Sequence, residues 1–384
     1  MAYFLMASGL LCIWAGLHPF STYPLSLVVL RKWRRRPLPR GSVPKDSADA
    51  RMAVLMCAYN EERVIEAKLE NLLSLQRMHP GLAIYVYVDA ASDRTAQLVE
   101  PYRDRIFLHV APERMGKTYG MNLLMAEVSE PIVVFTDANV MIDEAAPARL
   151  LRYFSDPQIG CVCGHLRYTN ARESVTASSG SLYWRLDEWT KRLETATGSA
   201  MGADGSLFAI RRSLHKVPPV DMFDDIYVSM MVLCQGSRVV QADDVIAYEE
   251  SVPEQHEEFQ RKIRIGCQAF NAHLILWPAI KRLDLLSVYK YVSHKWLRWL
   301  TIFFFIAGGV LVEAALCVSG HVLVAAGLLA LALASLLAGY LSLTRVFSQI
   351  WDILTAFAGT GLGVLKSLRG HRFQTWTPAS SIRK

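Results

Sequence analysis

Cysteines are few, and their spacing excludes the common cysteine-based architectures. The seven cysteines are scattered from Cys12 to Cys317, with neither the paired spacing of a structural zinc site nor the even number of a closed disulfide framework. Cys161 and Cys163 flank a single valine on an apparent strand, where a core pair is favoured over a redox pair. The pattern is typical of small core residues in a reducing compartment.

Two glycine signatures of nucleotide binding are also absent. No G-x-G-x-x-G follows the first β-rich run of the soluble part, which disfavours a dinucleotide-dependent oxidoreductase. The G-K pair at 116–117 lacks the G-x-x-x-x-G-K spacing of a P-loop. These two absences disfavour both of these large classes of nucleotide-binding protein.

Charged residues are scarce. They make up 20% of the chain, against 52% hydrophobic residues, a balance typical of a soluble domain joined to membrane segments. The net charge of +6 comes from basic residues that cluster beside apolar spans, where the positive-inside rule accounts for them. We therefore expect membrane lipids, and no nucleic acid, among the partners.

The first apolar segment covers residues 3–30 and is followed at once by R-K-W-R-R-R. A secretory signal carries its positive charge before the apolar run, so residues 1–36 are predicted to be a transmembrane anchor with a cytoplasmic basic flank. Residues 37–50, rich in proline, glycine, serine and lysine, are predicted to form a linker. Residues 51–272 would then form a cytosolic domain.

More apolar segments follow the soluble part. Residues 273–296 are predicted to form an interfacial amphipathic helix on the inner leaflet, with Lys290 and His294 turned away from its apolar face. Residues 297–344 contain two stretches long enough to cross about 30 Å of hydrocarbon. Residues 345–384 would form a re-entrant or interfacial helix and a basic tail, because a further crossing would place that tail outside. Together these segments predict a multi-pass protein of the cell (inner) membrane.

The soluble part alternates short β-rich runs with amphipathic helical stretches, which predicts an α/β fold with a mostly parallel sheet covered by helices. Polar residues stand where its strands end or its helices begin. Because the carboxyl ends of parallel strands meet at one edge of a sheet, these side chains are expected to share one rim. They are Tyr59, Asn60, Glu61, Asp89, Arg114, Lys117 and Asp137.

These residue types suit a nucleotide with phosphates. A carboxylate at position 89 can accept from a base or a ribose hydroxyl, and Arg114 and Lys117 would meet a diphosphate. Asp137 and Asn139 point the same way on an alternating strand, so both could hold one divalent ion (Mg or Mn) against those phosphates. Taken alone, T-D-A-N is more often a turn whose Asp and Asn bond their own backbone.

The order of these elements resembles the family 2 glycosyltransferases, whose nucleotide-sugar-binding domain is of the GT-A type. The resemblance covers residues 50–270 and implies that the rim binds a nucleotide sugar. It further implies an acceptor contact at Asp204, in G-A-D, and a catalytic base in D-M-F-D-D-I. We assign the base to Asp225 and a cap or acceptor contact to Asp224, although the spacing alone favours the first turn of a helix.

Further charged residues lie near the end of the soluble part. Arg261 and Arg264 lie three apart, so on a helix they share a face and could clamp a diphosphate, unless they are solvated basic residues near the membrane. Asp243, Asp244 and the acidic run 249–258 are interpreted as loop and solvated surface.

The chain is similar to the polysaccharide synthase group, which includes the cellulose, chitin and hyaluronan synthases, with two departures. The second position of the D-x-D motif is Asn139, and Q-x-x-R-W is replaced by Q-R-K-I-R at 260–264. The resemblance implies a membrane-bound inverting glycosyltransferase that uses a nucleotide sugar, in our assignment a UDP-sugar, to extend a polysaccharide or a lipid-linked saccharide. A single-addition transferase acting on a membrane lipid is one alternative, and a non-enzymatic membrane subunit is another.

Overall fold

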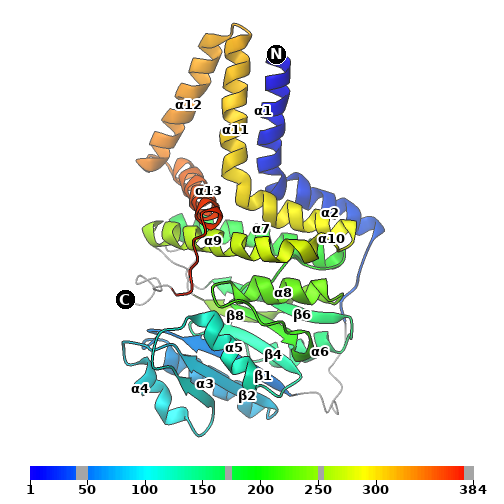
Figure 1. The fold of residues 1–384 in the computed structure, drawn as a ribbon, viewed down its shortest axis with the longest axis vertical. Helices are drawn as coiled ribbons and strands as arrows, with labels where there is room; N and C mark the ends of the chain where they lie inside the picture. Colours follow the sequence, from blue (N-terminus) through cyan, green and yellow to red (C-terminus); the bar gives the residue numbers. More distant parts are fainter. Residues whose placement is uncertain (40–50, 169–174, 250–254, 376–384) are drawn as a thin grey trace.

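The computed structural model describes residues 1–39, 51–168, 175–249 and 255–375. Most of the predicted linker at 37–50 therefore lies outside the described residues. Figure 1 shows three layers: a sheet with its covering helices at one end, a group of long helices across the middle, and α1, α11 and α12 projecting from the other end.

The sheet has eight strands in the order β3-β2-β1-β4-β7-β6-β8-β5. The pairs β3–β2, β2–β1, β1–β4 and β6–β8 are parallel, whereas β7 and β5 run antiparallel to their neighbours. The predicted α/β class with a mostly parallel sheet is confirmed, in the form of a mixed sheet. The strands are β1 Met52–Ala58, β2 Leu82–Val88, β3 Phe107–Val110, β4 Ile132–Asp137, β5 Met141–Ile142, β6 Ile159–Tyr168, β7 Leu207–Arg211 and β8 Arg238–Glu249.

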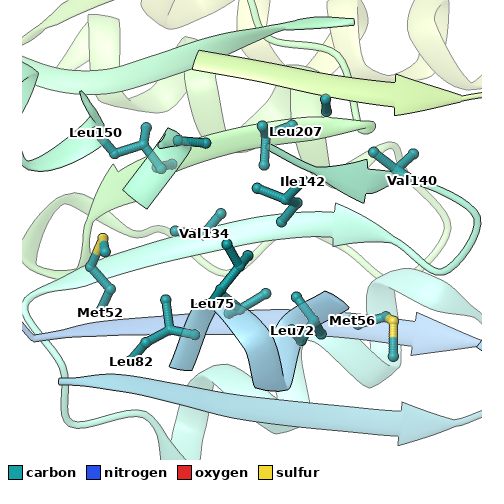
Figure 2. Packing of buried hydrophobic residues seen from close by; sticks show 14 of the residues in the cluster. Met52, Met56, Leu72, Leu75, Leu82, Val134, Val140, Ile142, Leu150 and Leu207 are labelled. Carbon is teal, nitrogen blue, oxygen red and sulfur yellow. The ribbon is translucent and has the colours of Figure 1, made fainter. Parts of the chain in front are cut away.

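Helices cover both faces of this sheet, so its central strands are apolar on both sides. Alternate residues of β1 enter different cores: Met52 and Met56 pack with Leu72 of α3, whereas Leu55 packs on the α5 and α8 side. Figure 2 shows the first of these cores. The helices of this part are α3 Ile65–Met78, α4 Thr95–Val99, α5 Lys117–Glu127, α6 Ala146–Phe154, α7 Val175–Ala196, α8 Asp224–Cys234 and α9 Gln255–Ile280.

The amino-terminal segment is two helices rather than the single apolar stretch expected over 3–30. Helix α1 (Ala2–Leu17) continues as a short 3₁₀ helix (His18–Phe20), and α2 (Thr22–Trp33) then leaves in another direction. Pro19 and Pro24 lie at this bend, and proline is favoured in the first turn of a helix but removes a hydrogen bond from a helix interior. Only the first part, Ala2–Phe20, is long and apolar enough to cross a membrane.

The carboxyl-terminal helices follow the predicted order, but no helix ends at residue 272, the predicted end of the catalytic domain. Helix α9 runs unbroken across that position to Ile280. It is followed by α10 (Leu285–Tyr291), a π-helical turn (Val292–Trp296), α11 (Leu297–Val318), α12 (Val322–Tyr340) and α13 (Arg345–Leu368). Among the described residues, Leu285–Val318 and Val322–Tyr340 are the other helical stretches that could cross a membrane.

The predicted interfacial helix has its basic residues inside the protein. Lys290 and His294 are buried, where Lys290 Nζ donates to the Glu194 carbonyl at 2.8 Å and His294 Nδ1 lies 2.8 Å from Glu194 Oε1. Arg298 pairs with Asp187 in the same cluster. These basic residues therefore lie against α7 instead of in solvent, and they hold this segment to α7 through buried hydrogen bonds and ion pairs. The interfacial position of the helix stays a prediction.

Candidate functional site

The site lies where β4 ends and α5 begins. Asp137 is the last residue of β4, and Lys117 is the first residue of α5. The strands β3, β2, β1 and β4 run parallel, so α5, which follows β3, starts at the same edge of the sheet at which β4 ends. The two side chains meet there, with Lys117 Nζ donating to Asp137 Oδ1 at 2.6 Å. The sequence-predicted partners of a diphosphate and a metal are thus in direct contact.

Two carboxylates from α8 face the same lysine. Asp224 Oδ1 lies 4.0 Å from Lys117 Nζ. Burial acts to lower the pKa of Lys117, but the charges of Asp137 and Asp224 raise it above its usual range. Lys117 is therefore an ammonium at neutral pH.

Asp225 has the environment of a base at neutral pH. Burial raises its pKa to about 7, the charge of Asp224 adds to this shift, and Lys117 opposes it. A base is most efficient when its pKa is near the working pH. Asp225 also accepts a hydrogen bond from the Ile226 amide at 2.6 Å and lies in the first turn of α8. The helix-start interpretation and the catalytic assignment are therefore compatible.

The remaining predicted acceptor residue lies beside this group. Asp204 Oδ2 accepts from Lys191 Nζ at 3.3 Å. The next residue, Gly205, borders the central lysine, since a Cβ there would lie 3.2 Å from Lys117 Nζ and 3.3 Å from Asp225 Oδ2. The G-A-D-G segment thus closes the site on the side of the assigned base.

The predicted metal ligands fit a divalent ion bound together with a nucleotide. Asn139 Nδ2 donates to Glu249 Oε1 at 3.0 Å, so its carbonyl oxygen is the atom left for a cation. A cation already stands on Asp137, namely the Lys117 ammonium. No group of three or more His, Cys, Asp or Glu residues in the described ranges could hold a metal by itself. Donor phosphates would therefore complete the coordination, as is usual for Mg²⁺.

The residues predicted to meet the nucleotide hold one another in place. Asp89 is buried and accepts from the amides of Met115 at 2.8 Å and Gly116 at 3.0 Å. The Arg114 guanidinium stacks on the Tyr59 ring at 3.6 Å. Arg114 thus lies against an aromatic ring instead of beside Lys117, and Asp89 fixes the R-M-G-K turn.

The other predicted rim residues join two turns. Asn60, which has a positive φ of 53°, accepts from the Ser92 amide at 2.8 Å. The Glu61 amide donates to Thr95 Oγ1 at 2.8 Å. The turn after β1 is therefore held against the turn after β2.

The two arginines of α9 have different neighbours. The Arg264 guanidinium lies 5.8 Å from the ring of Phe223, the residue before Asp224. Arg261 is exposed, and its charge acts on Glu249. A common diphosphate clamp by both remains a prediction.

Comparison with known proteins assigns this chain to a family. A sequence profile described as "Glycosyltransferase like family 2" matches residues 50–267, which is more than half of the chain. The chain belongs to this family. The family consists of glycosyltransferases, so the expected enzyme class is confirmed. The expected GT-A fold class is confirmed as well.

Curated relatives of this glycosyltransferase include two poly-beta-1,6-N-acetyl-D-glucosamine synthases. The one from Staphylococcus aureus (strain COL) is 29% identical over 195 residues, covering 48% of this chain and 46% of the relative. The one from Staphylococcus epidermidis is 25% identical over 169 residues, covering 43% and 40%. The matches thus span less than half the length of these relatives.

A solved structure resembles nearly the whole glycosyltransferase in fold. It is a mannosyltransferase from Pyrobaculum calidifontis in complex with GDP-Man and Mn²⁺, with a TM-score of 0.72 and 21% identity, covering 95% of this chain and 99% of that one. At this identity the likeness concerns the fold.

Sequence reasoning missed Glu249 of this glycosyltransferase. It was interpreted as solvated surface, but it ends β8 and bonds Asn139. Burial raises its pKa to about 7, and the nearby Asp137 adds to the shift while Arg261 opposes it. Its position at the carboxyl end of a strand is the same signal that identified Asp137, and the acidic run after it concealed that signal.

Lys68 was also missed. It is fully buried on α3, and its Nζ donates to Thr136 Oγ1 at 3.2 Å and to the Val140 carbonyl. These two atoms bracket the D-A-N turn. A lysine on the apolar face of a helix is usually a solvated residue with a buried stem, so only the three-dimensional structure shows that Lys68 supports the turn that carries the predicted metal ligands.

The carboxyl-terminal segment after α13 reaches the same rim. Gln268 Nε2 donates to the Phe373 carbonyl at 2.7 Å, and Arg372 pairs with Asp221 at 3.2 Å. Gln374 Nε2 then donates to the Met115 carbonyl at 2.9 Å. Gly116 is needed at this crossing, because it has a positive φ of 91° and a Cβ there would clash with the Gln374 carbonyl.

Proposed function

We propose that this protein is a membrane-bound inverting glycosyltransferase that transfers a sugar from a nucleotide sugar, in our assignment a UDP-sugar, to a growing polysaccharide or a lipid-linked saccharide. The observation that carries the proposal is the convergence of Lys117 with Asp137, Asp224 and Asp225 at one sheet edge. The names of the curated relatives support a polysaccharide product.

On the donor side, the residues would bind and neutralise a diphosphate leaving group. Asp137 and Asn139 would hold a divalent ion, Mg²⁺ or Mn²⁺, which supplies charge stabilisation to the departing diphosphate when bound. Lys117 adds a second positive charge in a partly buried site, where such interactions are stronger than in water. The Arg114–Tyr59 stack and the Asp89-held turn would receive the nucleoside.

On the acceptor side, Asp225 would remove one proton. The acceptor oxygen forms a bond to the anomeric carbon while the bond from that carbon to the diphosphate oxygen breaks, and the hydroxyl proton passes to the Asp225 carboxylate. Attack from the side opposite the diphosphate inverts the anomeric configuration. Asp204 and Asp224 would contact the acceptor.

A donor screen tests the proposal. Purified full-length protein in detergent, with Mn²⁺ or Mg²⁺, is incubated with UDP-GlcNAc, UDP-glucose, GDP-mannose or other nucleotide sugars, and released nucleoside diphosphate is measured. Release with one donor, increased by an acceptor, is expected. No release or transfer with any donor would contradict the proposal.

A single-addition transferase acting on a membrane lipid is the second candidate. It is favoured by the absence of tryptophan from Q-R-K-I-R at 260–264. Products from labelled donor separate the two: a ladder of lengths means polymer synthesis, and one added sugar means single addition.

We also propose an orientation in the cell (inner) membrane. Nucleotide sugars are cytosolic, so residues 51–272 would lie on the inner side, as the basic flank at 31–36 also indicates. With one crossing before the domain and two after it, the amino terminus would lie outside and residues 345–384 inside.

A further inference from the structure

The Lys117 side chain lies close to the three carboxylates of Asp137, Asp224 and Asp225. Lys117 Nζ lies 2.6 Å from Asp137 Oδ1 and 4.0 Å from Asp224 Oδ1. The position that a Cβ of Gly205 would take lies 3.2 Å from this Nζ and 3.3 Å from Asp225 Oδ2. The ammonium therefore faces the metal ligand, the assigned base and the neighbour of that base at once.

This position conflicts with a metal ion on the same carboxylate oxygen, Asp137 Oδ1. A divalent ion bound to Asp137 Oδ1 would approach a positive charge that is itself within hydrogen-bonding distance of that oxygen. The Lys117 side chain is only 15% exposed, so solvent and salt screen the repulsion weakly. A metal ion cannot bind Asp137 Oδ1 while the Lys117 ammonium donates a hydrogen bond to the same oxygen.

We propose that Lys117 is a tethered cation that neutralises Asp137 in the donor-free enzyme and transfers to the diphosphate when the donor arrives with its metal. The inference rests on the proposed function, because it takes a nucleoside diphosphate as the ligand. The diphosphate offers Lys117 new negative partners, and the departure of the ammonium leaves Asp137 to the divalent ion. Gly205, which carries no side chain, leaves space beside the ammonium for this movement.

The consequence is that metal and nucleotide bind cooperatively. A bare divalent ion must displace the ammonium without giving it a new partner, whereas an ion that arrives with a diphosphate does not. Linkage requires the effect to be reciprocal, so the nucleotide must strengthen metal binding by the same factor by which the metal strengthens nucleotide binding. The lysine thereby discourages the enzyme from holding metal when no donor is present.

Mn²⁺ binding tests this directly, without any turnover. Free Mn²⁺ is measured by electron paramagnetic resonance with the full chain in detergent, alone and with UDP or GDP as the nucleotide probe. In the wild type, the effective nucleotide should raise Mn²⁺ affinity roughly 5- to 150-fold, the usual range of such couplings. In Lys117→Met, Mn²⁺ alone should bind more tightly than in the wild type. The enhancement by nucleotide should be smaller than in the wild type, because only the contribution of phosphate ligation to the metal remains.

Two variants control for charge and folding. Lys281→Met removes the same charge at an exposed position after α9 and should behave like the wild type. Lys117→Arg keeps a cation beside Asp137 and should retain weak binding of Mn²⁺ alone, which decides the question if Lys117→Met does not fold. Tight binding of Mn²⁺ alone by Lys117→Arg would overturn the proposal.

The remaining outcomes separate this inference from the proposed function. If the wild type binds nucleotide with Mn²⁺ but Lys117→Met keeps the wild-type affinity for Mn²⁺ alone and the full enhancement, the tethered-cation role is refuted and the glycosyltransferase assignment stands. If neither nucleotide binds to the wild type in the presence of Mn²⁺, the nucleotide-sugar assignment fails and the inference falls with it.

Discussion

Replacement of Asp225 by asparagine should lower activity and raise stability together. Burial and the charge of Asp224 raise the pKa of this carboxyl from 3.8 to about 7. At a pH between these two values, Asp225 is therefore protonated in the folded state and ionised in the unfolded state. Stability contributed by the protonated form is present below pH 4 and is lost as pH rises through 7.

The size of the effect follows from the shift. At about 1.4 kcal/mol per pKa unit, ionised Asp225 destabilises the ligand-free protein by up to about 4 kcal/mol above pH 7. Asparagine has no charge to bury, so Asp225→Asn should be more stable than the wild type at pH 8 and nearly equal to it at pH 4. With about 2–4 °C per kcal/mol for a domain of this size, the melting temperatures should differ by up to about 8–16 °C at pH 8.

Activity should change in the opposite direction. Loss of a general base lowers the chemical step by roughly two to four orders of magnitude, while donor binding should stay near the wild-type value. The wild-type kcat/KM should rise with pH through about 7, because the base must be ionised. In Asp224→Asn this midpoint should move to lower pH, since the like charge is removed.

The assay combines thermal melts in detergent, at several pH values with chelator and no nucleotide, and initial rates of nucleoside diphosphate release. Asp104→Asn, at an exposed site, is the matched control. A difference in melting temperature that is the same at pH 5 and pH 8, or unchanged turnover in Asp225→Asn, would refute the reasoning and point to Asp224 as the base.

Three further predictions concern the metal-ligand turn and the membrane. Asp137→Asn should abolish nearly all activity without unfolding the protein, and full turnover of the wild type in excess chelator would contradict this. Lys68→Met should weaken Mn²⁺ binding about 10- to 100-fold, the range for residues that orient metal ligands, in equilibrium titrations with nucleotide present; an unchanged affinity would show that Lys68 only fills space. Single cysteines in a background without native cysteines, treated with an impermeant reagent on intact cells, should be labelled at the amino terminus and between α11 and α12 but not within residues 51–272 or 345–384. Labelling within residues 51–272 would refute the orientation.

The sequence predicted the centre of the site well because the information there is local. Asp137 and Lys117 stand where a strand ends and a helix begins, and parallel strands bring such points together. The contact between them at 2.6 Å follows from that placement. The family and the fold class also rested on local sequence patterns, and both predictions were confirmed.

The missed features depend on contacts between distant residues. Glu249 and Lys68 support the D-A-N turn from β8 and α3. Lys68 does not differ in local pattern from a solvated charge, and the acidic run after Glu249 conceals its place at the end of a strand. Asp89 is held by backbone amides of the R-M-G-K turn, which a sequence does not reveal. Lys290 was predicted to lie on the polar face of an interfacial helix because lysine is usually solvated, yet it is buried against Glu194.

Transfer of a labelled sugar tests the central claim most directly. The full chain in lipid nanodiscs, with Mn²⁺, is given radiolabelled nucleotide sugars and a membrane lipid extract as acceptor, beside Asp137→Asn prepared in the same way. Labelled product with one donor from the wild type, and almost none from Asp137→Asn, is the predicted result. Equal transfer by both proteins, or none by the wild type with any donor, would contradict the assignment of glycosyl transfer to this site.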